Sequence, residues 1–273
     1  MWKTLSVDSD DCVPTSYREF YEQIDRDAEY TVTKRPQEHP AYAPLHAFVR
    51  LYDLATKKCL EIGASKGLFQ DLVPDYSGLD IAASLSRHFH KPYCTVQDDG
   101  TYPFGDDTFD AIWSWAVFEH IPNLDQALDE LVRVLKPGGV VYFAPAWQCR
   151  PWAAQGYAVR PYSDFDWKGK LIKASIPVRD SVAWRSLFVF PKRILRHLLF
   201  LAGKRGGPIP TIPLTPNYEK FWVSDGDAVH SIDPHDAILW FESRGLRCLS
   251  HPLNRRALLV RSGAIVIQKA RLR

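Results

Sequence analysis

Short apolar runs alternate with amphipathic stretches through the first half of the chain. Five apolar runs have the length of buried strands: 58–62, 76–80, 93–96, 109–115 and 140–144. Before the last of them, residues 123–136 repeat apolar positions at helical spacing. Strands that alternate with helices are typical of a parallel sheet covered by helices on both faces. The pattern therefore predicts an α/β fold.

Both ends of the chain add elements to this pattern. An apolar stripe at helical spacing precedes the first strand, at Leu45, Phe48, Val49 and Tyr52. Near the other end, Asp233 and Pro234 resemble a helix start and predict a helix over 233–244. Two further strands, 246–250 and 264–268, follow without a crossover helix between them, so they should pair antiparallel.

The first apolar run ends in an acid and opens into a loop of small residues. Glu61 is followed by Gly63 and Gly67, and the apolar positions after the loop begin a helical stripe. Such a junction predicts backbone N–H groups at a helix N-terminus, facing a ligand. The spacing is neither the dinucleotide-binding fingerprint nor a phosphate-binding P-loop, and a turn that binds nothing also fits it.

Composition and charge narrow the class of protein. The 273 residues, 46% of them hydrophobic, suffice for one large domain with a smaller appended region. The cysteines are scattered, no secretory signal is visible, and no apolar run reaches about 18 residues. We therefore expect a reduced, cytoplasmic protein. From Trp167 onward, nineteen basic residues face seven acidic ones, which can mark a surface for an anionic partner or simply a mixed surface.

Three motifs in a fixed order resemble the class I S-adenosylmethionine-dependent methyltransferases, and more closely their small-molecule (type 11-like) group. They are Pro103–Asp110, Phe118–Ile121 and Leu128–Gly139, the last of which reads LDELVRVLKPGG. The resemblance implies a Rossmann-like, doubly wound sheet of seven strands, six parallel and the last antiparallel. It also implies S-adenosylmethionine as the cofactor, bound at the carboxyl ends of the strands, with S-adenosylhomocysteine as the product.

The resemblance divides the chain into four parts. They are an N-terminal helical cap (1–56), a cofactor-binding core (57–145), an acceptor-binding insertion or lid (146–230) and a C-terminal helix with an antiparallel strand pair that completes the core (231–273). For the N-terminal part, a cap over the cofactor pocket and a plain packing helix both fit.

The resemblance also assigns cofactor contacts to residues at strand ends. It places Glu61 near the cofactor's amino group, Asp80 on the ribose hydroxyls and Asp98 on the adenine amino group. Its other expected contacts are Gly63, Ala64, Ser65 and Gly67 under the ribose and methionine, Ile81 after the second strand, Asp99 through its amide, and Ser114, Trp115 and Ala116 beside the transferable methyl. The family usually has a glycine at the position of Ser65. Taken singly, the acids could be helix caps, turn residues or solvated charges.

His120 is the candidate general base if the acceptor is a hydroxyl. It follows the strand 109–115 closely, and imidazole titrates in the useful range. A role as a pocket wall is the alternative. We expect O-methylation of a sugar, glycolipid precursor or other small metabolite; N- or C-methylation and a non-catalytic cofactor-binding module stay open. Nucleic acid is not expected as acceptor, because residues 114–117 lack the Asn-Pro-Pro-aromatic motif of amino-methylating DNA enzymes.

The insertion 146–230 supplies candidate acceptor contacts. Its flat aromatic side chains suit a sugar ring or an aromatic acceptor: Trp147, Trp152, Tyr157, Tyr162, Trp167, Tyr218 and Trp222. Its two Asp-x-Asp spacings, 164–166 and 225–227, offer fewer oxygen ligands than a hard cation needs, so no metal ligands are assigned and a metal site stays open as the less favoured alternative. Residues 184–205 mix apolar and basic side chains, which suits a helix on an anionic membrane surface or, alternatively, packing in the core or in a dimer. The oligomeric state stays open.

Overall fold

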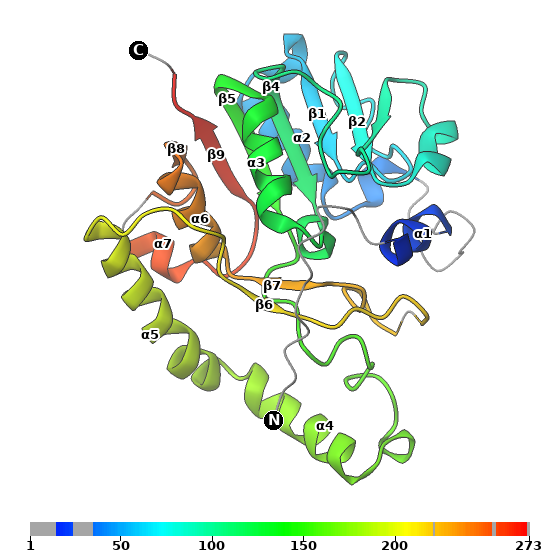
Figure 1. The fold of residues 1–273 in the computed structure, drawn as a ribbon, viewed down its shortest axis with the longest axis vertical. Coiled ribbons are helices and arrows are strands. Elements are labelled where there is room, and N and C mark those ends of the chain that lie inside the picture. The colour runs from blue at the N-terminus through cyan, green and yellow to red at the C-terminus, as the bar shows by residue number, and fades with distance from the viewer. Residues whose placement is uncertain (1–14, 24–34, 221, 253–254, 272–273) are drawn as a thin grey trace.

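A seven-stranded sheet forms the centre of the computed structural model, which describes residues 15–23, 35–220, 222–252 and 255–271 (Figure 1). Its strands are β1 (Cys59–Ile62), β2 (Tyr76–Asp80), β3 (Tyr93–Thr95), β4 (Phe109–Trp115), β5 (Leu135–Ala144), β8 (Leu246–Cys248) and β9 (Ile265–Lys269). They lie in the order β3-β2-β1-β4-β5-β9-β8. Within this sheet β9 runs antiparallel to its neighbours and the other six strands are parallel, which confirms the predicted Rossmann-like fold.

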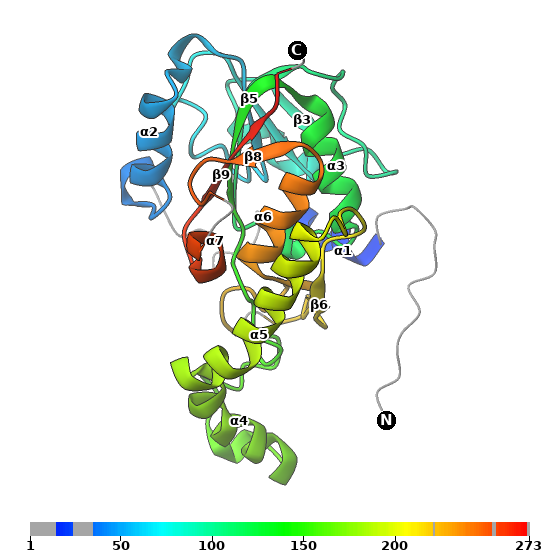
Figure 2. The ribbon, with the colours of Figure 1, turned by 90° about the vertical axis from the view of Figure 1, so that its left-hand side faces the viewer.

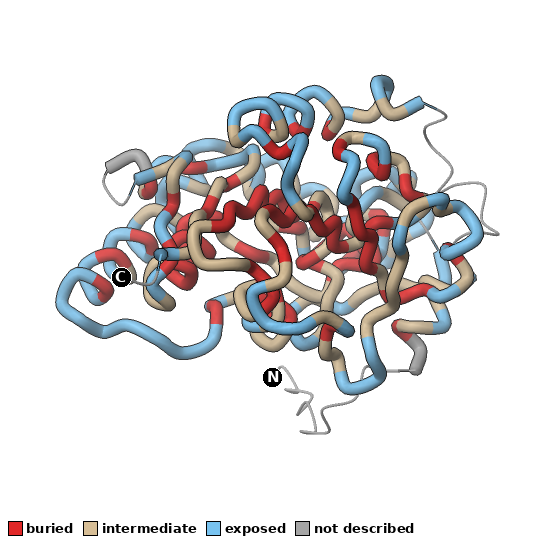
Figure 3. The backbone as a smooth tube through the Cα atoms, turned by 90° about the horizontal axis from the view of Figure 1, so that it is seen from above, coloured by how far each residue is buried: buried red, intermediate tan, exposed pale blue. Residues whose placement is uncertain are grey.

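Helices cover both faces of this sheet (Figures 1 and 2). The helices α3 (Leu124–Val134) and α6 (Pro234–Ser243) pack on one face, around Leu60, Ile112 and Leu128. The helix α2 (Tyr42–Leu51) packs on the other face, around Leu45 and Phe48. Because both faces are covered, β1 is buried throughout and β4 at most of its positions (Figure 3), which explains their largely apolar sequences.

Two helix starts follow the expected capping chemistry. The Asn123 side chain accepts a hydrogen bond from an amide in the first turn of α3, and Asp233 does the same for α6, with Pro234 at its first position. The helix predicted over 233–244 is thereby confirmed. The helix predicted over 123–136 ends earlier, because β5 begins directly at Leu135 and the Pro-Gly-Gly sequence lies within the strand, where the pairing register with β4 shifts.

The predicted helix after the glycine loop was wrong, because residues 65–71 form turns. The connection from β1 to β2 is short, Gly67 adopts a left-handed conformation (φ +70°), and Pro74 stands before the next strand. Too few residues stay available for a helix that must also return the chain to the sheet. The next connection likewise contains only the 3₁₀ turn η5 (Ala83–His88).

The insertion lies beyond the carboxyl ends of the parallel strands (Figure 1). Its small antiparallel sheet pairs β6 (Thr211–Pro213) with β7 (His230–Ile232), and its two helices are α4 (Trp167–Asp180) and α5 (Val182–Leu201). The remaining elements are α1 (Thr15–Gln23), α7 (Arg255–Leu259) and the 3₁₀ turns η3 (Pro36–Glu38), η4 (Leu54–Thr56), η6 (Phe118–His120) and η7 (Tyr162–Asp164). In the described ranges, every helix is too short or too polar to cross a bilayer.

Candidate active site

The glycine loop is held against the sheet by its own backbone. The amides of Gly63 and Ala64 both donate to the carbonyl of Leu79, at 2.8 and 3.1 Å. Gly63 has φ +74°, and a Cβ there would lie 2.1 Å from the nearest methyl of Val117. A side chain at Gly63 would therefore clash as well as strain the backbone. The loop thus passes close to the end of β4, and the amides of Gly63, Ala64, Ser65 and Gly67 donate to acceptors within the protein.

Asp80 ties this loop to the end of β2. Its carboxylate accepts hydrogen bonds from the amides of Ser65 (2.8 Å), Ile81 (2.7 Å) and Ala82 (3.4 Å). Burial raises the pKa of Asp80, and these three amides partly counter it. A carboxylate has about four lone-pair sites, so about one site remains for a ribose hydroxyl. Asp80 therefore fits the role that the resemblance assigns to it, and also fixes the left-handed Ser65 (φ 45°).

Glu61 is enclosed near the end of β1. It is 6% exposed, and the Tyr76 hydroxyl donates to its Oε2 at 2.5 Å. Burial raises the pKa of Glu61 to about 8, against the lowering effect of the Tyr76 hydrogen bond. A cationic amino group placed beside Glu61 would offset this penalty by stabilising the carboxylate. The site therefore suits the amino group of the cofactor's methionine part.

Asp98 and Asp99, which the resemblance places at the adenine, are exposed, and α1 lies beside Asp98. Asp98 has a 94% exposed side chain and pairs with Arg18 at 3.3 Å. Arg18 also donates to the carbonyls of Ile81 (2.9 Å) and Val96 (3.2 Å), so it joins the ends of β2 and β3. The Asp99 carboxylate binds the backbone amide and hydroxyl of Thr101, which lowers its pKa. Arg18 therefore occupies the neighbourhood in which an adenine would meet Asp98.

The end of β4 completes the cofactor side of the site. Ile62 of β1 pairs with both Leu79 of β2 and Ser114 of β4, so the three strand ends share one edge of the sheet. Ser114 is buried, Trp115 is half-buried, and Ala116 adopts φ 51° while its amide donates to a β5 carbonyl. A left-handed alanine is strained, and such strain concentrates at functional sites.

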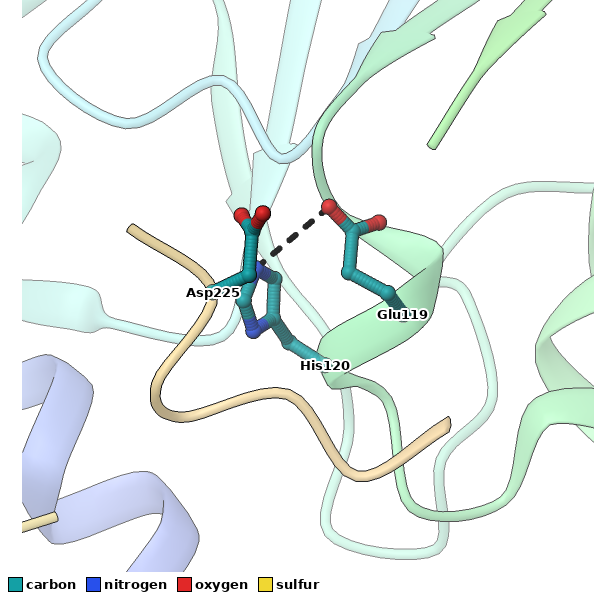
Figure 4. A group of neighbouring side chains, drawn as sticks. All are labelled: Glu119, His120 and Asp225. Carbon is teal, nitrogen blue, oxygen red and sulfur yellow. Dashed lines mark ion pairs between the residues drawn. The ribbon is translucent and has the colours of Figure 1, made fainter. Parts of the chain in front are cut away.

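His120 stands at the end of η6 among carboxylates (Figure 4). Its Nε2 lies 3.5 Å from Glu119 Oε1, its Nδ1 lies 3.4 Å from Asp227 Oδ2, and Asp225 is a further neighbour. Burial lowers the pKa of His120, but Glu119, Asp227 and Asp225 outweigh it and raise the pKa above its usual range. Burial also raises the pKa of Glu119 and of Asp225. The cluster therefore favours a shared proton close to the imidazole.

Several residues of this site were not recognised from the sequence. Tyr21 of α1 donates to Asp227 at 2.7 Å, and Glu22 accepts from the amides of Ala83 and Ser84 at 2.6 and 3.0 Å. Together with Arg18 they place α1 between the strand ends and the insertion. The sequence predicts a partly helical, polar stretch with interleaved aromatic residues over 17–30, but this pattern indicates no partner. Residues 24–30 of that stretch lie outside the described ranges.

The two Asp-x-Asp spacings have different roles. Asp166 caps α4 by accepting from the Gly169 amide at 2.7 Å, and Asp164 pairs with Arg160, so this spacing is structural. Asp225 instead joins Glu119 and His120, and the three offer ligand atoms within 4.8 Å of one another. Three such atoms could begin a cation site, but Mg²⁺ and Ca²⁺ require more oxygen ligands.

The aromatic side chains of the insertion do not form one acceptor pocket. Trp147 packs on Phe143 in the core, and Trp152 lies between Arg150 and Arg179. Tyr157 stacks on Phe165, Trp222 lies against Arg160, and Tyr162 and Trp167 are exposed. Tyr218 is the member of this set that lies beside α1, in contact with Phe20 and Tyr17. The expected aromatic acceptor platform is therefore dispersed.

The sheet order, the glycine loop and the acids at successive strand ends define a nucleotide-type cofactor site of the class I methyltransferase fold. Residues 60–143 match the family model of a methyltransferase domain. This part of the chain is therefore a class I S-adenosylmethionine-dependent methyltransferase domain, with S-adenosylmethionine as its cofactor.

Similar proteins share this part of the chain. Tocopherol O-methyltransferase of Arabidopsis thaliana is 37% identical over 83 residues, which cover 30% of this chain and 23% of the relative. A sterol 4-C-methyltransferase of Caenorhabditis elegans is 50% identical over 100 residues, covering 31% and 30%. The chain thus spans less than a third of the length of either relative. A SAM-dependent methyltransferase from Methanosarcina mazei aligns with a TM-score of 0.46 and 16% identity over 82% of this chain and 98% of that one.

Proposed function

We propose that the whole protein is a methyltransferase that transfers the methyl group of S-adenosylmethionine to a hydroxyl of a small acceptor, with His120 as the general base. The observation that carries this proposal is the buried pairing of His120 with carboxylates directly after β4. This position adjoins the end of the sheet at which the glycine loop and Asp80 lie.

When bound at this site, S-adenosylmethionine would supply a sulfonium methyl group, whose carbon–sulfur bond breaks in line as the acceptor atom bonds to the carbon, with S-adenosylhomocysteine as the leaving group. The loop at Gly63 and the carboxylate of Asp80 align the cofactor, so much of the catalysis is positioning. A hydroxyl that enters beside His120 gives its proton to an imidazole nitrogen as its oxygen attacks the methyl. The carboxylates of Glu119 and Asp227 stabilise the imidazolium that forms.

The acceptor class is the open part of this proposal. A sugar, a glycolipid precursor or another small metabolite suits the polar cluster around His120, and tocopherol, named for one relative, is likewise a small molecule. C-methylation is the second candidate, since another relative is named as a sterol 4-C-methyltransferase. A base is also useful in that reaction, so the acceptor atom must be identified by experiment. A module that binds the cofactor without turnover is the non-catalytic alternative.

The test combines product identification with a base-deletion variant. Labelled methyl transfer into cell extracts, followed by mass spectrometry of the labelled product, identifies the acceptor and the methylated atom. His120→Ala should lower turnover by roughly 10²–10⁴-fold and keep S-adenosylhomocysteine affinity. His46→Ala, at an exposed position on α2, is the matched control and should keep both.

The pH profile provides a second readout. Because the carboxylates raise the pKa of His120, the wild-type rate should increase with pH through an inflection above the usual imidazole value of 6.5. Near-wild-type turnover in His120→Ala would show that His120 is a pocket wall and would favour an amine or carbon acceptor. Cofactor binding without any transfer would favour the non-catalytic module.

A further inference from the structure

The helix α5 is amphipathic in the reverse sense to an ordinary surface helix. Its inward side is polar: Arg193 is 4% exposed, donates to the carbonyls of two α7-region residues and pairs with Asp233 at 3.0 Å. Arg196 pairs with the buried Asp236, and His197 is buried against His235. Ion pairs and hydrogen bonds, more than apolar packing, therefore hold α5 to the body of the protein.

The outward side of α5 is apolar. Its exposed large side chains are Trp184, Leu187, Phe188, Ile194, Leu195, Leu198, Leu199 and Leu201. Leu187, Leu195 and Leu198 are 67%, 59% and 58% exposed, and the last two line a shallow apolar groove with Phe190 and Pro191. A surface helix normally turns its apolar stripe to the core and its polar face to water. We define the outward face of α5 as the eight exposed apolar residues named above. An exposed apolar surface of this kind indicates a binding site for an apolar partner.

The helix α4 extends the same kind of surface. It exposes Trp167, Leu171 and Val178, and its contacts with other elements are mainly with α5. Figures 1 and 2 show the two helices as an arm that projects from the body beyond the carboxyl ends of the parallel strands. The α4–α5 arm (167–201) thus presents apolar side chains on the side of the molecule where the candidate active site lies.

The charge of the arm indicates whether a second copy of the chain or a membrane surface would bind it. Residues 167–205 contain ten lysine and arginine residues and one acidic residue, Asp180, and two of the ten, Arg193 and Arg196, are paired inward with Asp233 and Asp236. Lys168, Lys170, Lys192 and Lys204 are exposed. Two copies of so basic a surface would repel each other, whereas anionic lipid headgroups complement the cations while the acyl boundary accepts the apolar side chains.

We propose that the α4–α5 arm docks the protein peripherally on an anionic membrane surface, with the outward face of α5 in the headgroup–acyl boundary. The docking stands without the proposed methylation. Its consequence for the substrate rests on the proposed function: the arm would hold the candidate active site near the bilayer, so the acceptor would be an amphipathic, lipid-borne molecule.

Vesicle co-sedimentation of the full chain tests the docking. The protein should sediment with vesicles of phosphatidylcholine mixed with phosphatidylglycerol at low salt, and should be released at high salt because screening weakens the basic contribution. Vesicles of phosphatidylcholine alone should retain much less. Equal retention on both vesicles, unaffected by salt, would overturn the anionic docking.

Variants assign the binding to the arm. Leu195→Glu and Leu198→Glu should each weaken partitioning by roughly tenfold or more, since each removes a buried leucine from the boundary. Lys192→Glu and Lys204→Glu should each weaken it by at least roughly fivefold. Leu51→Glu, at a 76% exposed position on α2, is the matched control and should change nothing.

Two further measurements separate the possible failures. Sedimentation velocity without lipid reports the oligomeric state. A wild type that dimerised and a Leu198→Glu variant that stayed monomeric, with neither protein bound by vesicles, would overturn the proposal. Calorimetry with S-adenosylhomocysteine should give the same affinity for the arm variants and the wild type, because the arm is remote from the glycine loop. Since the two readouts are independent, absent cofactor binding would contradict the proposed function alone.

Discussion

The seven-stranded sheet and the α4–α5 arm differ in which side chains they bury. The sheet buries apolar side chains, whereas helix α5 of the arm buries charged ones and exposes apolar ones. In the sheet and its helices, Ile112 and Leu128 are fully buried, and the functional carboxylates lie near strand ends. On α5, Arg193 and His197 face the body while Leu198 faces solvent. Burial of apolar area stabilises the first region, whereas paired charges fix the second.

This difference has a functional meaning. The described sheet has seven strands and presents the loop and Asp80 at one edge, where His120 follows the end of β4. The arm contributes little apolar burial of its own, so its apolar face is available for an external surface. The insertion also sends Asp225 and Asp227 back to His120, which joins the two regions at one site.

The largest expected difference is in the free energy of unfolding of two leucine variants, one in the core and one on the arm. Leu128→Ala should lower the free energy of unfolding by about 2–5 kcal/mol, because it leaves a cavity in a fully buried site. Leu198→Ala should change it by no more than about 0.5 kcal/mol, because the side chain is mostly exposed. Urea denaturation of both variants measures the difference. Equal losses would show that the arm packs as an ordinary core helix.

On the arm, removal of a buried charged side chain should lower the free energy of unfolding more than removal of an exposed one. Arg193→Ala removes a buried guanidinium, leaves two carbonyls without their donor and takes from Asp233 its cationic partner, so that Asp233 keeps the His235 amide and Gln148. The free energy of unfolding should fall by about 2–3 kcal/mol. Lys192→Ala, exposed on the same helix, should have almost no effect in the same denaturation assay. A stable Arg193→Ala protein would contradict the role given to the inward ion pairs.

At the sheet edge, Asp80→Ala should weaken S-adenosylhomocysteine binding by roughly 10–100-fold, since hydrogen bonds to a charged group are lost and the loop amide of Ser65 loses its acceptor. Calorimetry measures this loss. Asp106→Ala, at an exposed position far along the chain from the loop, provides the control. Unchanged affinity in a folded Asp80→Ala protein would remove Asp80 from the cofactor site.

A pH dependence of stability and of cofactor affinity is expected from Glu61. Because its folded-state pKa of about 8 lies above the ordinary value of 4.5, ionisation costs stability, and the free energy of unfolding should fall as pH rises between these values. A bound cationic amino group favours the ionised form. Affinity for S-adenosylhomocysteine should therefore rise by up to about tenfold per pH unit below 8. Glu61→Gln should abolish both dependences, and a variant that retained them would assign them to another group.

Much of the sheet followed from local pattern. The strands at 76–80 and 109–115 have the predicted bounds, because continuous apolar runs between turn residues are typical of strands buried on both faces. The antiparallel pairing of β8 and β9 is confirmed, although the connection between them, which was expected to lack a helix, contains the short α7. The motif resemblance supplied the class of protein and its cofactor, and the match over residues 60–143 confirmed them.

Other features depended on the tertiary structure. The helical period after Gly67 did not produce a helix, because the return path to β2 limits the chain there. The approach of Asp227 to His120, and of Arg18 to Asp98, joins residues far apart in sequence. Local pattern carries no information about such contacts.

The orientation of α5 in the arm is the clearest example of a feature that the sequence did not determine. By itself, the sequence of α5 predicted that apolar and basic side chains are mixed along one stretch of helical length. It did not determine which side meets the body, because that choice depends on partners elsewhere in the chain. Asp233 and Asp236 accept the arginines and so turn the apolar side outward. A helical period fixes which residues share a face, and only the surrounding charges decide where that face points.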